Sequence, residues 1–575
     1  MFKFCAVAVI LAATVLPLAW TQSVASKLPA KAQPTTRKKL SPEQELWCPI
    51  LESGRTQATS LEPAMRSLLL RGIAGGTKQC DPKQVTSILV SAFQATLEIP
   101  ATEEDLDAKA KDAANSPPTP DSSLRKLVMD VSAKRDLQIN ALRDLLAIDE
   151  SQVEPLLPEA ESSVRNEILS SLLYKAVHAK NFDRAITILN EIPGPGFPYY
   201  AATKLMFDLP TTRDADKQAI FLRALAADKD SHAFIVGGDD FTTMIVRFWK
   251  HLPAPVVLEA IHQTLEEAKS HSDHVNLSSS AGSVNFTNEY EYRLFELLPV
   301  LEQLDKSKAE DLLKDSQEAK AQLKQFPNGM QSLDSTIRDT LRAKGEQPQL
   351  NSGAVGMNDL TPVLARDKEV QNYAVRAEDL ATMAAANPTQ AIAAAASLPD
   401  VADRLAPRAQ ALLAIARATA KTNSGAAKTA LSEMAESLNK TDPSAQKQYW
   451  EQSALWIEGS EIAHRIGEDD PATKLIHQGL SQAAKLKLKD EDPDDPNLAL
   501  KAWWPSVSAT SRLLATLGEM SPQAALAEAR DIQDADVRVL CEVKMANKAL
   551  GARGFPSNQT VAKTSASWSH MGVDQ

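Results

Sequence analysis

Aromatic side chains are scarce in this sequence: they make up 5% of its 575 residues, although 43% of the residues are hydrophobic. Alanine and leucine carry most of the apolar content, and continuous runs of β-branched residues are few. Because alanine and leucine lose little side-chain freedom in a helix, this composition predicts an all-α protein. The shortage of aromatic residues also argues against an enzyme that stacks sugars on tryptophan platforms.

Long apolar runs are absent beyond the N-terminus, where a membrane-spanning helix would need about 20 such residues. The chain starts with Lys3, an apolar run over residues 4–18, and the small-x-small motif Ser23-Val24-Ala25. This arrangement is typical of a cleavable secretory signal. We therefore expect residues 1–25 to be removed. The mature protein is expected to be periplasmic or extracellular, with no transmembrane segment.

Cysteine is rare, with four in the chain, and Cys5 lies within the predicted signal. Cys48, Cys80 and Cys541 remain, so at least one of them is unpaired or bonded to another chain. In an oxidising compartment the natural pair is Cys48 and Cys80, which share a short N-terminal segment; two buried free thiols are the alternative. We predict this disulfide and a buried free thiol at Cys541. A glycine-rich turn at 72–76 would bring the sulfurs together, and the bridge would fasten a terminal hairpin with a neighbour on one side only.

Positive charge is in deficit, because 74 acidic residues outnumber 62 Lys and Arg and leave a net charge of −12. Most of the surface would repel phosphate, so nucleic-acid binding is not expected. The sequence also contains no nucleophile elbow, phosphate-binding loop or Cys-x-x-Cys pair. We therefore assign no catalytic, cofactor-binding or metal-ligating residue.

Helix-start signals, by contrast, recur along the whole chain. A capping residue directly precedes proline at Ser41, Asp81, Thr361, Asn387, Asp442, Asp470 and Ser521. The side-chain oxygen of such a residue accepts from an orphan N–H, and proline at the first helical position loses no hydrogen bond. Gln44, Gln84 and Gln390 follow three of these caps at the spacing of a capping box. These signals predict many helices of ordinary length.

Breaks in the helical pattern divide the chain. The predicted parts are a basic, proline-rich linker at 26–42, an N-terminal helical segment at 43–100, a linker at 101–123, a helical repeat region at 124–343 with a polar loop at 271–288, a linker at 344–359, an alanine-rich helical repeat region at 360–553 and a disordered tail at 554–575.

Three segments align without gaps on Ala185-Ile186, Ala391-Ile392 and Ala525-Leu526. Each places apolar residues four and seven positions after the alanine, on one face of a helix, and a second helical pattern follows. This internal similarity predicts repeated helical hairpins.

The first of these segments, AKNFDRAIT at 179–187, resembles the turn and second helix of a tetratricopeptide repeat. The matching residues are Asn181, Phe182, Asp183, Ala185 and Ile186. Lys180 stands where that motif usually has glycine, and Pro193 comes early. The whole chain also resembles exported bacterial helical-repeat proteins, and this resemblance implies no particular activity. The resemblance implies an α-solenoid of antiparallel helical hairpins, tetratricopeptide- or HEAT-like, in two or three arched segments.

The stretch Gly237-Gly238-Asp239-Asp240-Phe241 differs by one carboxylate from the GGDEF signature of diguanylate cyclases. In those enzymes the motif lies on a turn between two strands. Here the apolar residues after it recur at helical spacing, and no acidic metal-binding strand precedes it. We therefore predict a loop whose Asp239 or Asp240 caps a helix, and no cyclase activity. Loss of that cap in Asp240→Ala would cost about 1 kcal/mol.

Three other groups invite a functional reading. His262, Glu266, His271, Asp273 and His274 have the density of a zinc site but lack the HExxH pattern, so we predict a solvated helix end. Asp490, Asp492 and Asp494 resemble the start of an EF-hand loop, but Asp495 and Lys501 replace its glycine and glutamate, which leaves an acidic turn. Trp450, Trp456, Trp503 and Trp504 are predicted to pack helices against one another.

Stacked hairpins bury a continuous core and expose a concave face, which usually binds a protein or peptide. The sequence therefore favours a non-enzymatic binding or scaffolding module of the cell envelope, without a cofactor. The alternative is an all-α carbohydrate-active enzyme, a toroid of the glycosidase or polysaccharide lyase type. Two carboxylates about 5–10 Å apart beside aromatic side chains in one cleft would favour the enzyme.

Overall fold

The computed structural model describes residues 40–114, 122–231, 240–271, 274–279, 282–330, 361–402, 405–441, 450–486 and 500–552. Within these ranges the protein is all-α, as the composition predicts, with one small β-hairpin. None of the described helices is long and apolar enough to span a membrane.

Helices of the first half of the chain are α1 (Pro42–Ala58), α2 (Pro63–Cys80), α3 (Val85–Leu97), α4 (Glu103–Ala114), α5 (Ser122–Leu146), α6 (Ser162–His178), α7 (Phe182–Glu191), α8 (Tyr199–Asp208), α9 (Asp214–Ser231), α10 (Phe241–Phe248), α11 (Ala254–Ala268), α12 (Glu289–Leu304), α13 (Lys306–Asp315) and α14 (Gln317–Gln325). Those of the second half are α16 (Thr361–Ala386), α17 (Pro388–Ala395), α18 (Pro407–Thr419), α19 (Ser424–Asn439), α20 (Trp450–Arg465), α21 (Asp469–Leu486), α22 (Pro505–Met520), α23 (Pro522–Arg530) and α24 (Ala535–Ala549). Short 3-10 turns include η1 (Pro82–Gln84), η5 (Trp249–His251) and η9 (Lys501–Trp503).

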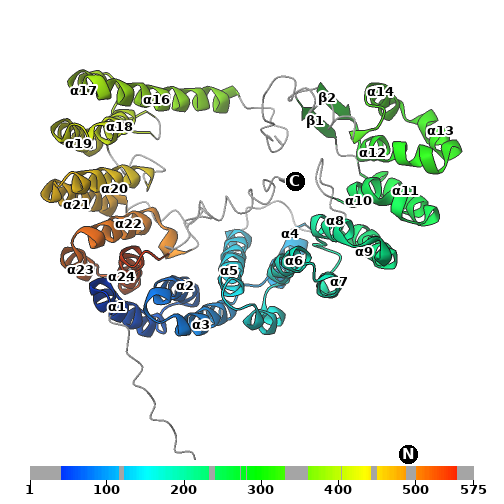
Figure 1. The fold of residues 1–575 in the computed structure, drawn as a ribbon, viewed down its shortest axis with the longest axis horizontal. Helices are drawn as coiled ribbons and strands as arrows, with labels where there is room; N and C mark the ends of the chain where they lie inside the picture. Colours follow the sequence, from blue (N-terminus) through cyan, green and yellow to red (C-terminus); the bar gives the residue numbers. More distant parts are fainter. Residues whose placement is uncertain are drawn as a thin grey trace, which may run out of the picture.

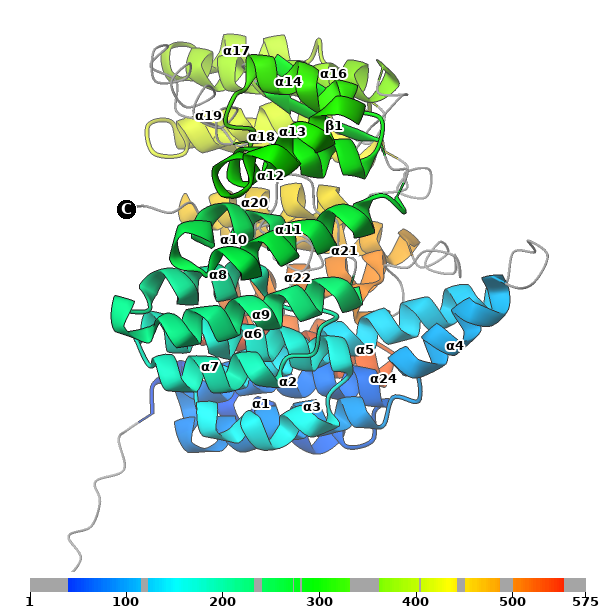
Figure 2. The same cartoon turned by 90° about the vertical axis from the view of Figure 1, so that its right-hand side faces the viewer.

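The helices form a broad arc with an inner and an outer layer (Figure 1). On one side of the arc α6, α8, α10 and α12 lie inside, and α7, α9, α11 and α13 lie outside. On the other side α18, α20 and α22 lie inside α19, α21 and α23. Figure 2 shows α7, α9, α11 and α13 one above another along the first side. The inner layer therefore presents a row of helices toward the middle of the arc.

The first and last described helices meet in the middle of this stack, where α24 packs against both α1 and α2 (Figure 1). The Asn547 side chain is fully buried there, and its Nδ2 donates to the carbonyl oxygen of Gly72 at 2.9 Å. In space the helices thus run from α16 to α24 and continue from α1 to α14. The expectation that the N-terminal hairpin has a neighbour on one side only is wrong, because α24 covers one side and α3 the other.

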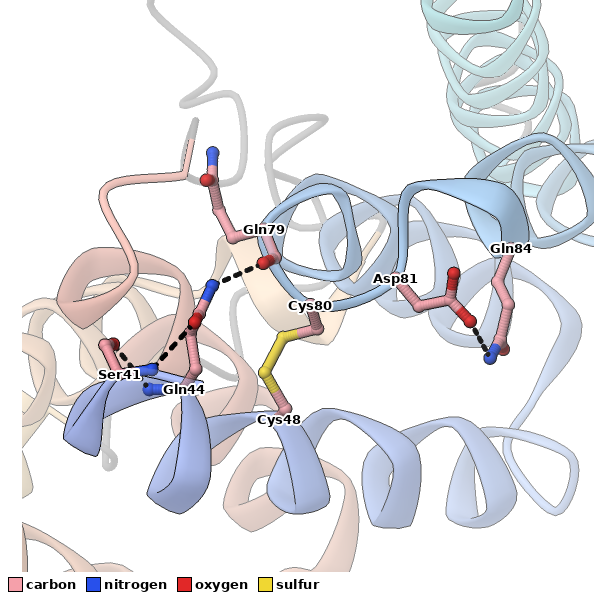
Figure 3. Close-up of a disulfide and its surroundings, with 7 residues drawn as sticks. All are labelled: Ser41, Gln44, Cys48, Gln79, Cys80, Asp81 and Gln84. Carbon is pink, nitrogen blue, oxygen red and sulfur yellow. Dashed lines mark hydrogen bonds between the residues drawn. A yellow bond between two sulfur atoms is a disulfide. The ribbon is translucent and has the colours of Figure 1, made fainter. Parts of the chain in front are cut away.

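A disulfide joins Cys48 on α1 to Cys80, the last residue of α2, with a Cα–Cα distance of 5.8 Å (Figure 3). Beside it, Gln44 Nε2 donates to the carbonyl oxygen of Gln79 at 2.7 Å. The glycine-rich turn predicted at 72–76 is wrong: α2 runs through it, and the chain reverses at 59–62 instead. Cys541, on α24, is a buried free thiol.

Close packing explains why a glycine sits inside α2. A Cβ on Gly76 would come within 2.6 Å of Leu51 Cδ1 on α1 and would also collide with Asn547 Oδ1 on α24. Only a residue without a side chain lets three helices approach each other here. Glycine in this stretch therefore serves helix packing rather than a turn.

The polar loop predicted at 271–288 is wrong over most of its length. Strands β1 (Val275–Ser279) and β2 (Gly282–Phe286) pair antiparallel, with Val275 opposite Phe286. Val275, Val284 and Phe286 are buried, and alternate residues of a strand point to the same face. The serines and asparagines between these apolar residues hide the two-residue period in the sequence.

The linker predicted at 101–123 is also wrong in part, because Glu103–Ala114 forms α4. The hydroxyl of Thr102 accepts a hydrogen bond from the backbone N–H of Asp105 at 3.1 Å, as an N-cap does. Three acidic residues occupy the first turn of α4, where they complement the helix dipole. The other predicted linkers and the tail lie almost wholly outside the described residues.

Some of the proline-marked helix starts are confirmed in detail. Ser41 and Gln44 make both hydrogen bonds of a capping box at the start of α1. Asn387 caps α17, and Asp81 caps η1. The boxes predicted at Gln84 and Gln390 are wrong, because each amide contacts the side chain of its cap instead of the backbone.

The remaining starts depart further from the prediction. Ser521 stands at the N-cap position of α23 but makes no side-chain cap. Helix α21 begins at Asp469, one residue before the predicted cap Asp470. Thr361 is already the first residue of α16, and Asp442 lies outside the described ranges.

The three similar segments form the short helices α7, α17 and α23. Their aligned alanines, Ala185, Ala391 and Ala525, are each 0% exposed. The residues four positions later are buried as well: Leu189, Ala395 and Ala529. The aligned positions thus have the same packing role in all three helices.

Candidate functional site

Asp240 in the GGDDF stretch is the N-cap of α10, and its Oδ1 accepts from the backbone N–H of Thr243 at 3.0 Å. Residues 237–239 lie outside the described ranges. The element that follows the motif is a helix, whereas a cyclase would need a strand there. The predicted cap at Asp240 is confirmed.

The carboxylate of Asp240 also has a second partner that the sequence did not suggest. Its Oδ2 lies 2.6 Å from Nη1 of Arg293 on α12. The same guanidinium contacts Glu289 at 3.3 Å, Glu296 at 3.1 Å and the Thr242 hydroxyl at 2.7 Å. Asp240 and Arg293 are 3% and 4% exposed, so this ion cluster is almost fully shielded from water.

Carboxylates outnumber the single arginine in this cluster, and the pKa values of Glu296 and of the nearby Asp228 are raised. Burial raises the pKa of Glu296 to about 7; Arg293 opposes this shift and Asp240 adds to it. Burial likewise raises the pKa of Asp228 on α9 to about 7, again against Arg293. The arginine stays charged, because the attraction of Asp240 and Glu296 outweighs the effect of its burial and raises its pKa. Near neutral pH the cluster therefore holds both protonated and ionised carboxyl groups.

Glu296 connects this cluster to a groove of about 1140 Å³. Most of the side chains that line the groove come from α6, α8, α10 and α12, which belong to the inner layer of the arc (Figure 1), and the others come from η5 and from Asn328 after α14. Helix α8 contributes Tyr200, Thr203, Lys204 and Phe207, and α12 contributes Glu296, Pro299, Val300 and Gln303. Both sets follow the spacing i, i+3, i+4, i+7, so each helix turns one face to the groove.

Cationic side chains dominate the charged lining of the groove. They are Lys204, Arg247 and Lys250, and His178 and His251 line the groove beside them. Glu296 is the one carboxylate among the described residues that line the groove, and it already accepts from the Tyr292 hydroxyl at 2.6 Å and from Arg293. The groove is therefore locally positive on a protein whose net charge is −12.

Aromatic rings stand between these cations. Tyr174 lies 6.4 Å from Tyr200 in a stacked arrangement. Lys204 Nζ lies 6.0 Å from the Phe207 ring, and Lys250 Nζ lies 5.2 Å from the Trp249 ring. Phe207 is 77% exposed and Tyr200 43% exposed. Exposed apolar area of this kind is a common property of interaction surfaces.

The remaining candidates from the sequence do not meet in a site. His262 and Glu266 form an exposed pair at 3.8 Å on α11, and His274 is exposed at the start of the hairpin. In the described part of the chain no three His, Cys, Asp or Glu side chains are placed to hold a metal ion. Asp490, Asp492 and Asp494 lie outside the described ranges. Trp456 is fully buried in α20, and Trp503 and Trp504 pack against the core before α22.

Comparisons of the chain with protein-family models, with curated proteins and with solved structures find no match. The groove itself was not found from the sequence, although a signal existed. Tyr200, Lys204 and Phe207 place aromatic and basic residues on one face of a helix, where a core-facing stripe would be aliphatic. The face of α8 that carries these residues indicates a groove only when the lining residues of α10 and α12 are known to lie beside it.

Proposed function

We propose that this protein is an exported, non-enzymatic binding module of the cell envelope, built as an α-solenoid of antiparallel helical hairpins. The two-layer order of the helices and the shared burial of Ala185, Ala391 and Ala525 support a repeat architecture of the tetratricopeptide type. The Lys180 turn between α6 and α7 supports it too, because Lys180 has φ 55° where the repeat usually has glycine. Export is supported by the signal-like start of the chain and by the bridge between Cys48 and Cys80.

The observation that carries the proposal is the groove on the inner layer. Exposed Phe207 and Tyr200 offer apolar anchors, and basic side chains surround them. Aromatic residues and arginine are enriched at the centres of protein interfaces. The groove thus has the chemistry of a docking site for another polypeptide.

The same groove gives little support to a carbohydrate-active enzyme. That chemistry needs two carboxylates in the cleft, one as acid and one as base or nucleophile. Among the described residues that line the groove, Glu296 is the one carboxylate, and Arg293 and Tyr292 already bind it. Asp240 is close to the same arginine nitrogen but does not line the groove.

Site-specific photo-crosslinking in the producing cell tests the proposal. Phe207 is replaced by the photoreactive analogue benzoylphenylalanine, and in a matched control the exposed Leu222 on α9 is replaced instead. We expect a discrete, protease-sensitive adduct from position 207 and none from position 222. Equal adducts from both positions would contradict the proposal, and so would cleavage of a cell-wall polysaccharide by the purified protein.

A further inference from the structure

We infer that the groove recognises a short acidic segment of a partner protein, one that carries an apolar or aromatic residue among its carboxylates. This inference rests on the proposed function and adds the chemistry of the ligand. Its basis is a groove whose described lining combines cations, exposed rings and a single carboxylate that is bonded inside the protein.

Charge is the first part of the argument. Lys204, Arg247 and Lys250 line the groove. Among the described lining residues the one acid is Glu296, and Asp208, one turn along α8, pairs with Lys204 at 3.2 Å. Glu296 Oε1 and Oε2 are taken by Tyr292 and Arg293, so this carboxylate is engaged inside the protein and is not directed to a ligand. An acidic segment would therefore meet complementary charge, which raises both affinity and the rate of encounter.

Apolar area is the second part. Phe207 is 77% exposed, and Lys204 lies over its ring. A leucine or phenylalanine of the partner could cover this ring while neighbouring carboxylates reach the lysine ammonium groups. Trp249 with Lys250 repeats the same combination on η5. Two such ring–cation pairs favour a ligand that alternates acidic and apolar groups over a purely ionic one.

Other anionic polymers fit the molecule less well. A nucleic acid or an acidic polysaccharide carries charge along its whole length, and its flanks would run over a surface whose overall charge is −12. An acidic segment of a protein concentrates its charge within the groove and can be followed by neutral or basic residues. The groove, at about 1140 Å³, is also somewhat larger than the usual drug-sized pocket and suits a short peptide.

Fluorescence anisotropy with the purified mature chain tests the inference. The probes are a fluorescein-labelled, glutamate-rich peptide with one central phenylalanine, and a matched peptide in which glutamine replaces glutamate. We expect the glutamate peptide to bind at least about tenfold more tightly and to lose affinity as salt is raised. Equal binding of the two peptides would overturn the inference.

Variants locate the binding in the groove. The double variant Lys204→Glu, Lys250→Glu should weaken binding of the glutamate peptide by about tenfold or more. Phe207→Ala should also weaken it, and because this side chain is exposed the fold should stay intact by circular dichroism. The matched control is Lys83→Glu, an exposed lysine on η1 outside the groove, which should leave affinity unchanged. Equal losses in Lys83→Glu and the double variant would refute the assignment.

Two further probes separate the alternatives. Tighter binding of a single-stranded oligonucleotide or of oligogalacturonate than of the glutamate peptide would replace our ligand class with theirs. A protein adduct from position 207 together with no preference for the glutamate peptide would leave the binding module in place and reject the acidic ligand. Failure of the adduct itself would reject the proposed function.

Discussion

At the scale of single residues, the most informative position is Lys180, the one described non-glycine residue with positive φ. It follows α6, and the N–H of Asn181 bonds to the carbonyl oxygen of Ala176 at 2.9 Å. The same bond pattern occurs after Gly467 and Gly551, which have φ 82° and 64°. These are Schellman ends, where a left-handed residue terminates the helix. Lysine carries a steric cost there that glycine does not.

Replacing this lysine should therefore stabilise the protein. Lys180→Gly is expected to raise the free energy of unfolding by about 1 kcal/mol, because relief of the left-handed strain exceeds the entropy cost of glycine. Urea unfolding followed by circular dichroism measures the change. The control is Lys440→Gly, at the end of α19, where the backbone is right-handed with φ −77° and glycine should be neutral or destabilising. A loss of stability in Lys180→Gly would contradict the claim that the left-handed backbone at Lys180 is strained.

Asp240 is both the N-cap of α10 and the ion-pair partner of Arg293, and a substitution should remove both interactions. Asp240→Ala is expected to lower the free energy of unfolding by about 3–5 kcal/mol, because it leaves Arg293 buried without its closest partner. The value of about 1 kcal/mol expected from the sequence covers the cap alone. Asn423→Ala, which removes an N-cap from α19 with no ion pair, is the matched control for that smaller value.

The same variant settles the question raised by the GGDDF stretch. We expect no cyclic dinucleotide from the purified protein incubated with GTP and magnesium or manganese, before or after the substitution. Product that disappears in Asp240→Ala would reverse our interpretation of the motif. A loss of stability no larger than that of Asn423→Ala would show that the ion pair contributes nothing.

At the scale of elements, the ion cluster joins α10 and α12, and together with Asp228 on the neighbouring α9 it should make stability depend on pH. Burial raises the pKa of Glu296 from 4.5 to about 7 and that of Asp228 from 3.8 to about 7. The folded state thus binds these protons more tightly than the unfolded state does. Their contribution is fully present below the unfolded pKa values and is lost as the pH rises through about 7.

Urea unfolding at a series of pH values tests this coupling. Between about pH 5 and about pH 8 the free energy of unfolding should fall by about 2–3 kcal/mol on account of Glu296. Glu296→Gln imitates the protonated form and should flatten this part of the profile relative to the unaltered protein. An identical slope in both proteins would show that the attraction of Arg293 outweighs burial and keeps Glu296 ionised in the fold.

The bridge between α1 and α2 predicts a simple thiol count. Cys541 is fully buried, and burial raises the pKa of its thiol to about 12, so it should resist alkylation in the folded protein. Protein from an oxidising compartment should show one reactive thiol, and only after unfolding. Peptide mapping should link Cys48 to Cys80. Three free thiols, or a covalent dimer through Cys541, would rule this arrangement out.

At the scale of the whole molecule, the contact of α24 with α1 and α2 joins the two halves of the chain. A protease site inserted between residues 344 and 359 should therefore yield halves that still migrate together in size-exclusion chromatography. Gly76→Ala should weaken that association, since its Cβ would meet Leu51 and Asn547. Gly425→Ala in α19 is the control, because its nearest neighbour lies 3.6 Å away. Halves that separate on cleavage alone would contradict a stable junction.

The helical class and many helix starts follow from the sequence by itself. The capping box at Ser41 and Gln44 and the cap at Asp240 depend on neighbours within a few residues, and such neighbours are visible in the sequence. Local patterns gave a wrong prediction in two places. Polar residues hid the alternation of apolar residues along β1 and β2, and the glycines inside α2 suggested a turn.

Only the tertiary structure decided which distant residues share a site. Asp240 and Arg293 lie 53 residues apart, and Asn547 and Gly72 lie 475 apart. The groove combines stripes from four inner-layer helices, and each stripe alone resembles an ordinary amphipathic helix face. Helix formation is governed by contacts along one turn, so a sequence pattern can predict it. The groove and the junction of the chain ends depend instead on how the helices stack, which no local pattern in the sequence specifies.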